Sequence, residues 1–79
     1  MNFNQIHTVY FVGIGGIGMS ALARYFKSQG KRVIGYDKTE TVLTKKLVEE
    51  GVAVHYQDLG AEALYGLDKS NTLVVYTPA

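Results

Sequence analysis

A glycine-rich run, G-I-G-G-I-G-M-S at residues 13–20, follows directly after the apolar stretch 8–12. Three of its glycines, Gly13, Gly15 and Gly18, match the pattern G-x-G-x-x-G. Between a strand and a helix, the first glycine of this pattern permits a tight turn, the second lets a pyrophosphate approach the backbone, and the third lets helix and strand pack closely. The N–H groups of the first helical turn then face an anion, aided by the helix dipole. The run therefore predicts a strand, a helix and a site for a phosphorylated nucleotide.

The remainder of the chain alternates strand-length apolar stretches with segments of helical period, which is typical of a parallel sheet in an α/β protein. After the glycine run, apolar residues recur at helical spacing as far as Gly30. A second helix is expected to begin at Thr39 or Thr41 and to stop at Gly51, and a short helix is expected at 61–64. Strands are predicted at 8–12, 32–37, 52–56 and 72–76.

Right-handed crossovers between these strands predict one domain over residues 1–79 with the sheet order 3-2-1-4. We expect a Rossmann-like, three-layer fold with helices on both faces of the sheet. The glycine turn then lies at the carboxyl end of the first strand, beside the fourth, and open α/β sheets bind ligands in the crevice at that point. The fourth strand would be an uncovered sheet edge, so we expect the chain to be a piece of a larger protein.

Composition excludes several classes of function. The formal net charge is +1 and no run of lysine or arginine is longer than a pair, so neither nucleic acid nor an anionic membrane surface is expected as a partner. There is no cysteine, which excludes disulfides and thiolate chemistry. No apolar stretch is long enough to span a bilayer, and the first residues lack the features of a secretory signal. The expected compartment is the cytoplasm.

Residues 13–23, G-I-G-G-I-G-M-S-A-L-A, closely resemble the opening of the Mur ligases, and within that family the branch that joins L-alanine to UDP-N-acetylmuramate. The doubled glycine and the Met-Ser that follows it are not required for dinucleotide binding, so this run is more specific than G-x-G-x-x-G alone. The strand end G-Y-D at 35–37 and the run V-V-Y-T-P-A at 74–79 also look like the family. The resemblance covers essentially the whole chain.

The resemblance implies an N-terminal domain that binds the UDP part of UDP-N-acetylmuramic acid, within a three-domain, ATP-dependent ligase of peptidoglycan synthesis. In the family, a central domain binds ATP and magnesium, and a C-terminal domain positions L-alanine. The present sequence has no G-x-x-x-x-G-K-[ST] loop and no cluster of carboxylates and histidine that would hold magnesium. We therefore expect the chain to bind without catalysing, to hold no cofactor itself, and to have the central and C-terminal domains as its partners.

The resemblance also implies which residues bind the substrate. Asp37 would lie beside the uridine, and Thr77 near the diphosphate or the sugar. Met19 and Ser20 would begin the helix, and the Ser20 hydroxyl would either reach a phosphate or bond a carbonyl in the preceding turn. The backbone of four residues would face the diphosphate: Gly15, Gly16, Ile17 and Gly18.

The chain departs from the family at two positions. Tyr10 and Asp58 stand where many members carry histidine, and His55 lies three positions before the second of these. The contact with the uracil is therefore left without an assigned residue. We interpret His7 and His55 as surface residues at strand ends, because neither has a second histidine or a carboxylate at metal-binding spacing.

Two other functions are compatible with parts of the pattern. The chain could be an NAD(P)-binding Rossmann module of a dehydrogenase or of a potassium-transport regulatory domain, since Asp37 falls where an acidic residue holds the adenosine ribose. The pairs at 15–16 and 19–20 argue against this, as does Y-Q-D at 56–58, where the regulatory domains place Gly-Asp-Ala. The chain could instead be a structural domain without a ligand, in which Asp37 is a turn residue or caps the second helix.

Overall fold

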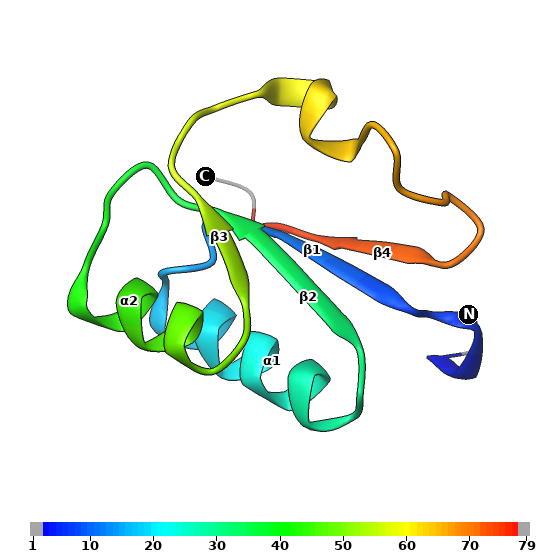
Figure 1. The fold of residues 1–79 in the computed structure, drawn as a ribbon, viewed down its shortest axis with the longest axis horizontal. Helices are drawn as coiled ribbons and strands as arrows, with labels where there is room; N and C mark the ends of the chain where they lie inside the picture. The colour runs from blue at the N-terminus through cyan, green and yellow to red at the C-terminus, as the bar shows by residue number, and fades with distance from the viewer. Residues whose placement is uncertain (1–2, 78–79) are drawn as a thin grey trace.

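A computed structural model describes residues 3–77 of the chain. Its four strands form one parallel sheet in the order β3-β2-β1-β4 (Figure 1). The α/β class and the Rossmann-like strand order predicted from the sequence are both confirmed. The elements in chain order are the 3-10 helix η1 (Phe3–Gln5), β1 (Thr8–Val12), α1 (Ile17–Ser28), β2 (Arg32–Tyr36), α2 (Val42–Glu49), β3 (Ala53–His55), the 3-10 helix η2 (Gly60–Leu64) and β4 (Thr72–Val75).

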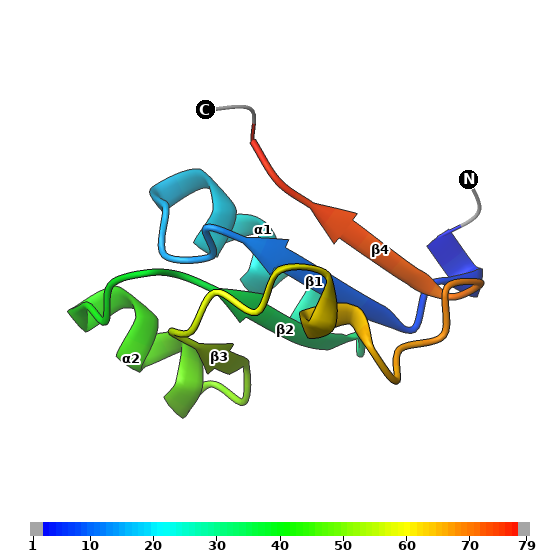
Figure 2. The same ribbon diagram turned by 90° about the horizontal axis from the view of Figure 1, so that it is seen from above.

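The two faces of the sheet are covered unequally. Both α-helices lie on one face, whereas the opposite face carries η2 and the chain on either side of it (Figures 1 and 2). We expected helices on both faces, and the second face has a five-residue 3-10 helix in place of an α-helix. Gly60 and Gly66, both at positive φ, bracket this segment and leave too few residues for an α-helix to propagate.

The hydrophobic core lies between the sheet and the two α-helices. Val9 and Phe11 of the central strand β1 are fully buried, and Phe11 packs against Phe26 of α1 with ring centroids 6.4 Å apart. Burying each side chain of this size contributes roughly 1.5–3 kcal/mol to stability. The core comprises Ile6, Val9, Phe11, Ile14, Met19, Ala23, Phe26, Val33, Leu47 and Val52, and so includes residues on both sides of the glycine turn.

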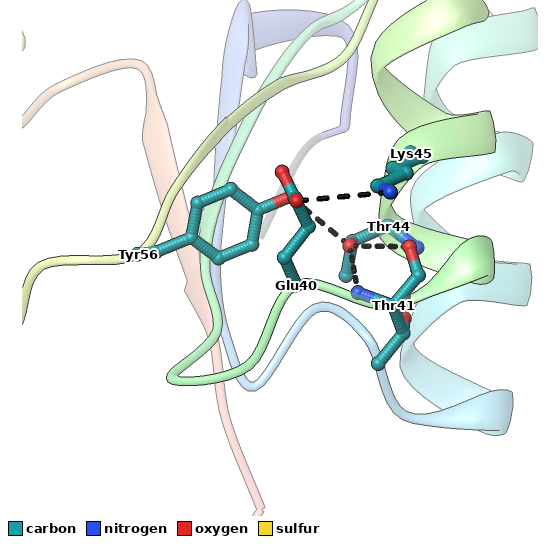
Figure 3. A network of polar contacts seen from close by, with 5 residues as sticks. All are labelled: Glu40, Thr41, Thr44, Lys45 and Tyr56. Atoms are coloured by element: carbon teal, nitrogen blue, oxygen red, sulfur yellow. Dashed lines mark hydrogen bonds and ion pairs between the residues drawn. The ribbon is translucent and has the colours of Figure 1, made fainter.

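The ends of the α-helices follow from local sequence. A capping box starts α2: the Thr41 hydroxyl accepts the N–H of Thr44 at 3.1 Å, and the Thr44 hydroxyl accepts the N–H of Thr41 at 2.8 Å (Figure 3). Of the two predicted caps, Thr41 is therefore the N-cap. The first helix ends just before Gly30, whose φ of 80° is the left-handed conformation predicted there.

Candidate functional site

The glycine turn connects the carboxyl end of β1 to the first residue of α1. β1 lies between β2 and β4, so the turn stands where successive crossovers leave in opposite directions along the sheet. Gly13 adopts a φ of 83°, which an L side chain rarely permits. The N–H groups of Gly13 and Ile14 both donate to the carbonyl of Tyr36, at 2.7 and 3.0 Å, and this ties the turn to the end of β2.

Three N–H groups have no partner in the described part of the chain, and they lie where the turn enters α1, which we call its outer side. They belong to Ile17, Gly18 and Met19, the first three residues of α1, and no side chain caps this helix end. The next N–H, that of Ser20, is already bonded to the carbonyl of Gly16 at 2.8 Å. Unpaired donors at the positive end of a 12-residue helix form an environment suited to an anion.

Asp37 binds the same turn at Gly15, which we call its inner side. Its Oδ2 accepts the N–H of Gly15 at 2.8 Å, and its Oδ1 accepts the N–H of Thr39 at 3.2 Å. Asp37 thus holds the glycine turn directly, and its predicted place beside the uridine stays a prediction. The predicted contact of the Gly15 N–H with a diphosphate stays a prediction, and it would require Asp37 to share or release this donor.

The space beside each glycine differs from what the pattern alone suggests at two positions, Gly15 and Gly18. A Cβ on Gly15 would lie 2.7 Å from Asp37 Oδ2 and 2.9 Å from Thr44 Cγ2, so the protein itself needs a glycine there. Outside its own helix and its chain neighbours, a Cβ on Gly18 would meet no atom of the described residues within 4 Å, so the expectation that Gly18 lets helix and strand pack closely is wrong. The close approach occurs instead at Gly35 of β2, where a Cβ would overlap the buried side chain of Ile14.

Of the other site residues predicted from the sequence, two point away from the outer side of the turn. Met19 is part of the core. Ser20 is only 2% exposed, and its hydroxyl donates to the carbonyl of Ile17 at 2.9 Å. Thr77 is exposed and follows β4 by two residues. Pro78 and Ala79 of the same sequence run lie outside the described residues.

A hydrogen-bonded pair lies on the face of the sheet away from the α-helices, and the sequence analysis does not predict it. Tyr10 Oη lies 2.8 Å from His55 Nε2, and His55 Nδ1 lies 2.9 Å from the carbonyl of Gln57. Because a carbonyl can only accept, Nδ1 carries the proton of a neutral His55 ring, and Tyr10 then donates to Nε2. Burial raises the pKa of the Tyr10 hydroxyl above its ordinary value, and the charge of Asp58 and the neighbouring Tyr36 act in the same direction.

The strand register offers a signal that would have revealed this pair. Tyr10 pairs with Ile34, two residues before Tyr36, and Tyr36 pairs with His55, so the three side chains share one face of the sheet. The face carries a cavity of about 330 Å³ between the sheet and η2, with Tyr10, Tyr36 and Asp58 among its lining residues. Asp58, one of the two departures from the family pattern, therefore lies beside Tyr10, the other.

Within residues 3–77, no group of three or more histidines, aspartates or glutamates is arranged to hold a metal ion. None of the helices in that range is long and apolar enough to cross a membrane.

Comparison with known proteins shows the family to which the chain belongs. Residues 8–79 match the family model described as "Mur ligase family, catalytic domain". The chain belongs to the Mur ligase family. The match to the Mur ligases begins at the first residue of β1 and includes the whole glycine turn.

Individual relatives agree with this assignment. The chain is 60% identical to the UDP-N-acetylmuramate–L-alanine ligase of Flavobacterium psychrophilum over 79 residues, which are all of this chain and 18% of that protein. It is 57% identical to the enzyme of the same name from Flavobacterium johnsoniae, again over 18% of that protein, and 58% identical to that of Cytophaga hutchinsonii over 17%. The chain therefore spans less than a fifth of the length of these Mur ligases.

Proposed function

We propose that this chain binds the UDP part of UDP-N-acetylmuramate as the N-terminal domain of a UDP-N-acetylmuramate–L-alanine ligase. The observation that carries the proposal is the set of N–H groups on Ile17, Gly18 and Met19 that have no partner within residues 3–77, in a family whose relatives are named for a nucleotide-sugar substrate. A diphosphate is the anionic part of such a substrate, and it would be bound by these donors. The open space beside Gly18 leaves room for its approach.

The proposal extends to the protein of which the chain would form one domain. That protein would use ATP and magnesium to form an amide bond with L-alanine, in the cytoplasm and in the synthesis of peptidoglycan. The residues present here do not fit ATP and magnesium: the sequence has no G-x-x-x-x-G-K-[ST] loop, and residues 3–77 offer no metal-ligand cluster. The chain would therefore bind the nucleotide sugar without catalysis, and the central and C-terminal domains would be its partners.

A titration of the ¹⁵N-labelled chain tests the binding proposal against its alternatives. We expect UDP-N-acetylmuramate and UDP to shift the amide resonances of residues 15–19, and NAD to shift them little. The amide of Gly30, at the opposite end of α1, serves as the internal control. A stronger response to NAD would favour the dinucleotide-binding alternative, and no response to any of the three ligands would favour a purely structural domain. Either result contradicts the proposal.

A further inference from the structure

Thr44 of α2 is fully buried and lies next to the glycine turn, and no step of the proposed binding uses it. Its methyl carbon Cγ2 lies against Gly15, where an added Cβ would come within 2.9 Å. Thr44 belongs to the second helix and is 29 residues further along the chain than Gly15. The contact therefore connects α2 to the inner side of the turn.

The Thr44 side chain is held in one orientation by three hydrogen bonds (Figure 3). Its hydroxyl oxygen accepts from the N–H of Thr41 at 2.8 Å and from the hydroxyl of Tyr56 at 3.0 Å, and it donates to the carbonyl of Thr41 at 3.0 Å. A hydroxyl has one donor and two acceptor positions, so the hydrogen-bonding capacity of Thr44 is filled. Rotation about its χ1 would break all three bonds, and the methyl group is thereby fixed against Gly15.

The turn is clamped between this methyl group and Asp37. Asp37 Oδ2 accepts the Gly15 N–H at 2.8 Å from one direction, and Thr44 Cγ2 closes the space on the Cβ side of the same residue. Gly15 precedes the three unpaired donors of Ile17, Gly18 and Met19 by two to four residues, so a displacement of Gly15 would reorient them. A clamp on Gly15 would therefore affect the directions of groups that it does not touch.

We infer that Thr44 is a positioning residue of the nucleotide site: it holds the glycine turn so that the first N–H groups of α1 converge on one point. The inference rests on the proposed function for the identity of the ligand, but not for the effect on the turn. Because Thr44 is fully buried, it would make no contact with the ligand itself. Its influence on affinity passes through Gly15.

The test uses two threonine-to-serine variants of the 79-residue chain. Thr44→Ser keeps the hydroxyl network and removes the methyl group that contacts Gly15. Thr8→Ser is the matched control, because Thr8 is also buried but lies at the amino end of β1, away from the turn. Amide resonances are recorded without ligand, and the Kd for UDP is then measured for both variants under conditions where each is fully folded.

We expect Thr44→Ser to shift the ligand-free amide resonances of residues 15–19 more than Thr8→Ser does, and to weaken UDP binding about threefold to tenfold. Unchanged resonances in Thr44→Ser, or equal shifts in both variants, would overturn the inference. This readout needs no ligand, so it remains decisive if the wild-type chain fails to bind UDP. That failure would contradict the proposed function alone.

A double variant separates positioning from general destabilisation. Gly15→Ala places a Cβ against both Thr44 Cγ2 and Asp37 Oδ2, and Thr44→Ser removes the first of these two clashes. We expect the resonance shifts of residues 17–19 caused by Gly15→Ala to be smaller in the Thr44→Ser background than in the wild type. Additive shifts would show that the two residues act independently, and would overturn the inference.

Discussion

The inner and outer sides of the glycine turn differ in what surrounds them. The inner side is Gly15, which is packed between Asp37 and Thr44 and gives its N–H to Asp37. The outer side is the run 17–19, whose N–H groups are unpaired among the described residues and where a Cβ on Gly18 would point into open space among those residues. The same G-x-G-x-x-G pattern therefore contains one glycine that is packed closely by the protein's own side chains and another with open space beside it.

The largest effect is expected from a side chain on the inner side. Gly15→Val would force its side chain into Asp37 and Thr44, and such overpacking costs about 3 kcal/mol. Nucleotide binding should be lost together with stability, because the displaced turn no longer presents its donors. Urea denaturation followed by calorimetric titration with UDP measures both quantities. A variant as stable as the wild type would show that the inner side is not tightly packed.

The next largest effect is expected from the hydroxyl behind the inner side. Thr44→Val preserves the side-chain shape but removes the hydroxyl that accepts the N–H of Thr41 in the capping box and the hydroxyl of Tyr56, at a cost of roughly 2 kcal/mol. The denaturation midpoint reports this loss. Thr39→Val, at an exposed position in the same connection, is the control and should be nearly neutral. Equal losses in the two variants would mean that the hydroxyl network contributes nothing specific.

A side chain on the outer side should affect binding and leave folding intact. Gly18→Val projects into open space, so its free energy of unfolding should stay within about 0.5 kcal/mol of the wild type. The same side chain would occupy the volume proposed for the diphosphate, and UDP affinity should fall about tenfold or more. If Gly18→Val binds UDP as well as the wild type does, the diphosphate lies elsewhere.

The smallest effect is expected at an ion pair remote from both sides of the turn. Arg24 of α1 donates two hydrogen bonds to Glu50, at 2.7 and 3.0 Å, and these bonds lower the pKa of the Glu50 carboxyl. A lowered pKa in the folded state gives stability that is present above the ordinary glutamate pKa of about 4.3 and is lost as the pH falls through the folded value. Both partners are exposed, so the contribution is small and is weakened by salt.

The measurement for this pair is the pH dependence of unfolding between neutral and acid conditions. Glu50→Gln should reduce the loss of stability below about pH 4.3 and should leave the amide resonances of residues 15–19 unchanged. A shift of these resonances would show that the turn responds to any change at the interface of the two helices. Such a result would contradict the proposed difference between the inner and outer sides of the turn.

Local sequence was sufficient for most of the fold. Apolar stretches and glycines located β1, α1, β2 and α2 to within one or two residues, because helix and strand periods are read directly from side-chain order. The choice between Thr39 and Thr41 as cap was not decided by propensity, since both residues are suitable. It was decided by Thr44, whose side chain completes the capping box only with a residue three positions earlier.

Contacts between distant residues could not be predicted in this way. The Tyr10–His55 pair joins positions 45 residues apart and follows from the register of three strands. A glycine pattern carries no information about what lies opposite each glycine, so Gly15 was assigned to a diphosphate and Gly18 to helix packing. The tertiary structure places Asp37 and Thr44 beside the first and open space beside the second.

The sequence by itself determined the α/β class, the strand order, the position of the glycine turn and its resemblance to the Mur ligases, all of which depend on residues close together in the chain. Only the tertiary structure decided which donors of that turn are bonded and which have no partner among residues 3–77. The reason is geometric: Asp37 and Thr44 reach Gly15 from the second strand–helix unit, and their positions depend on how that unit packs against the first.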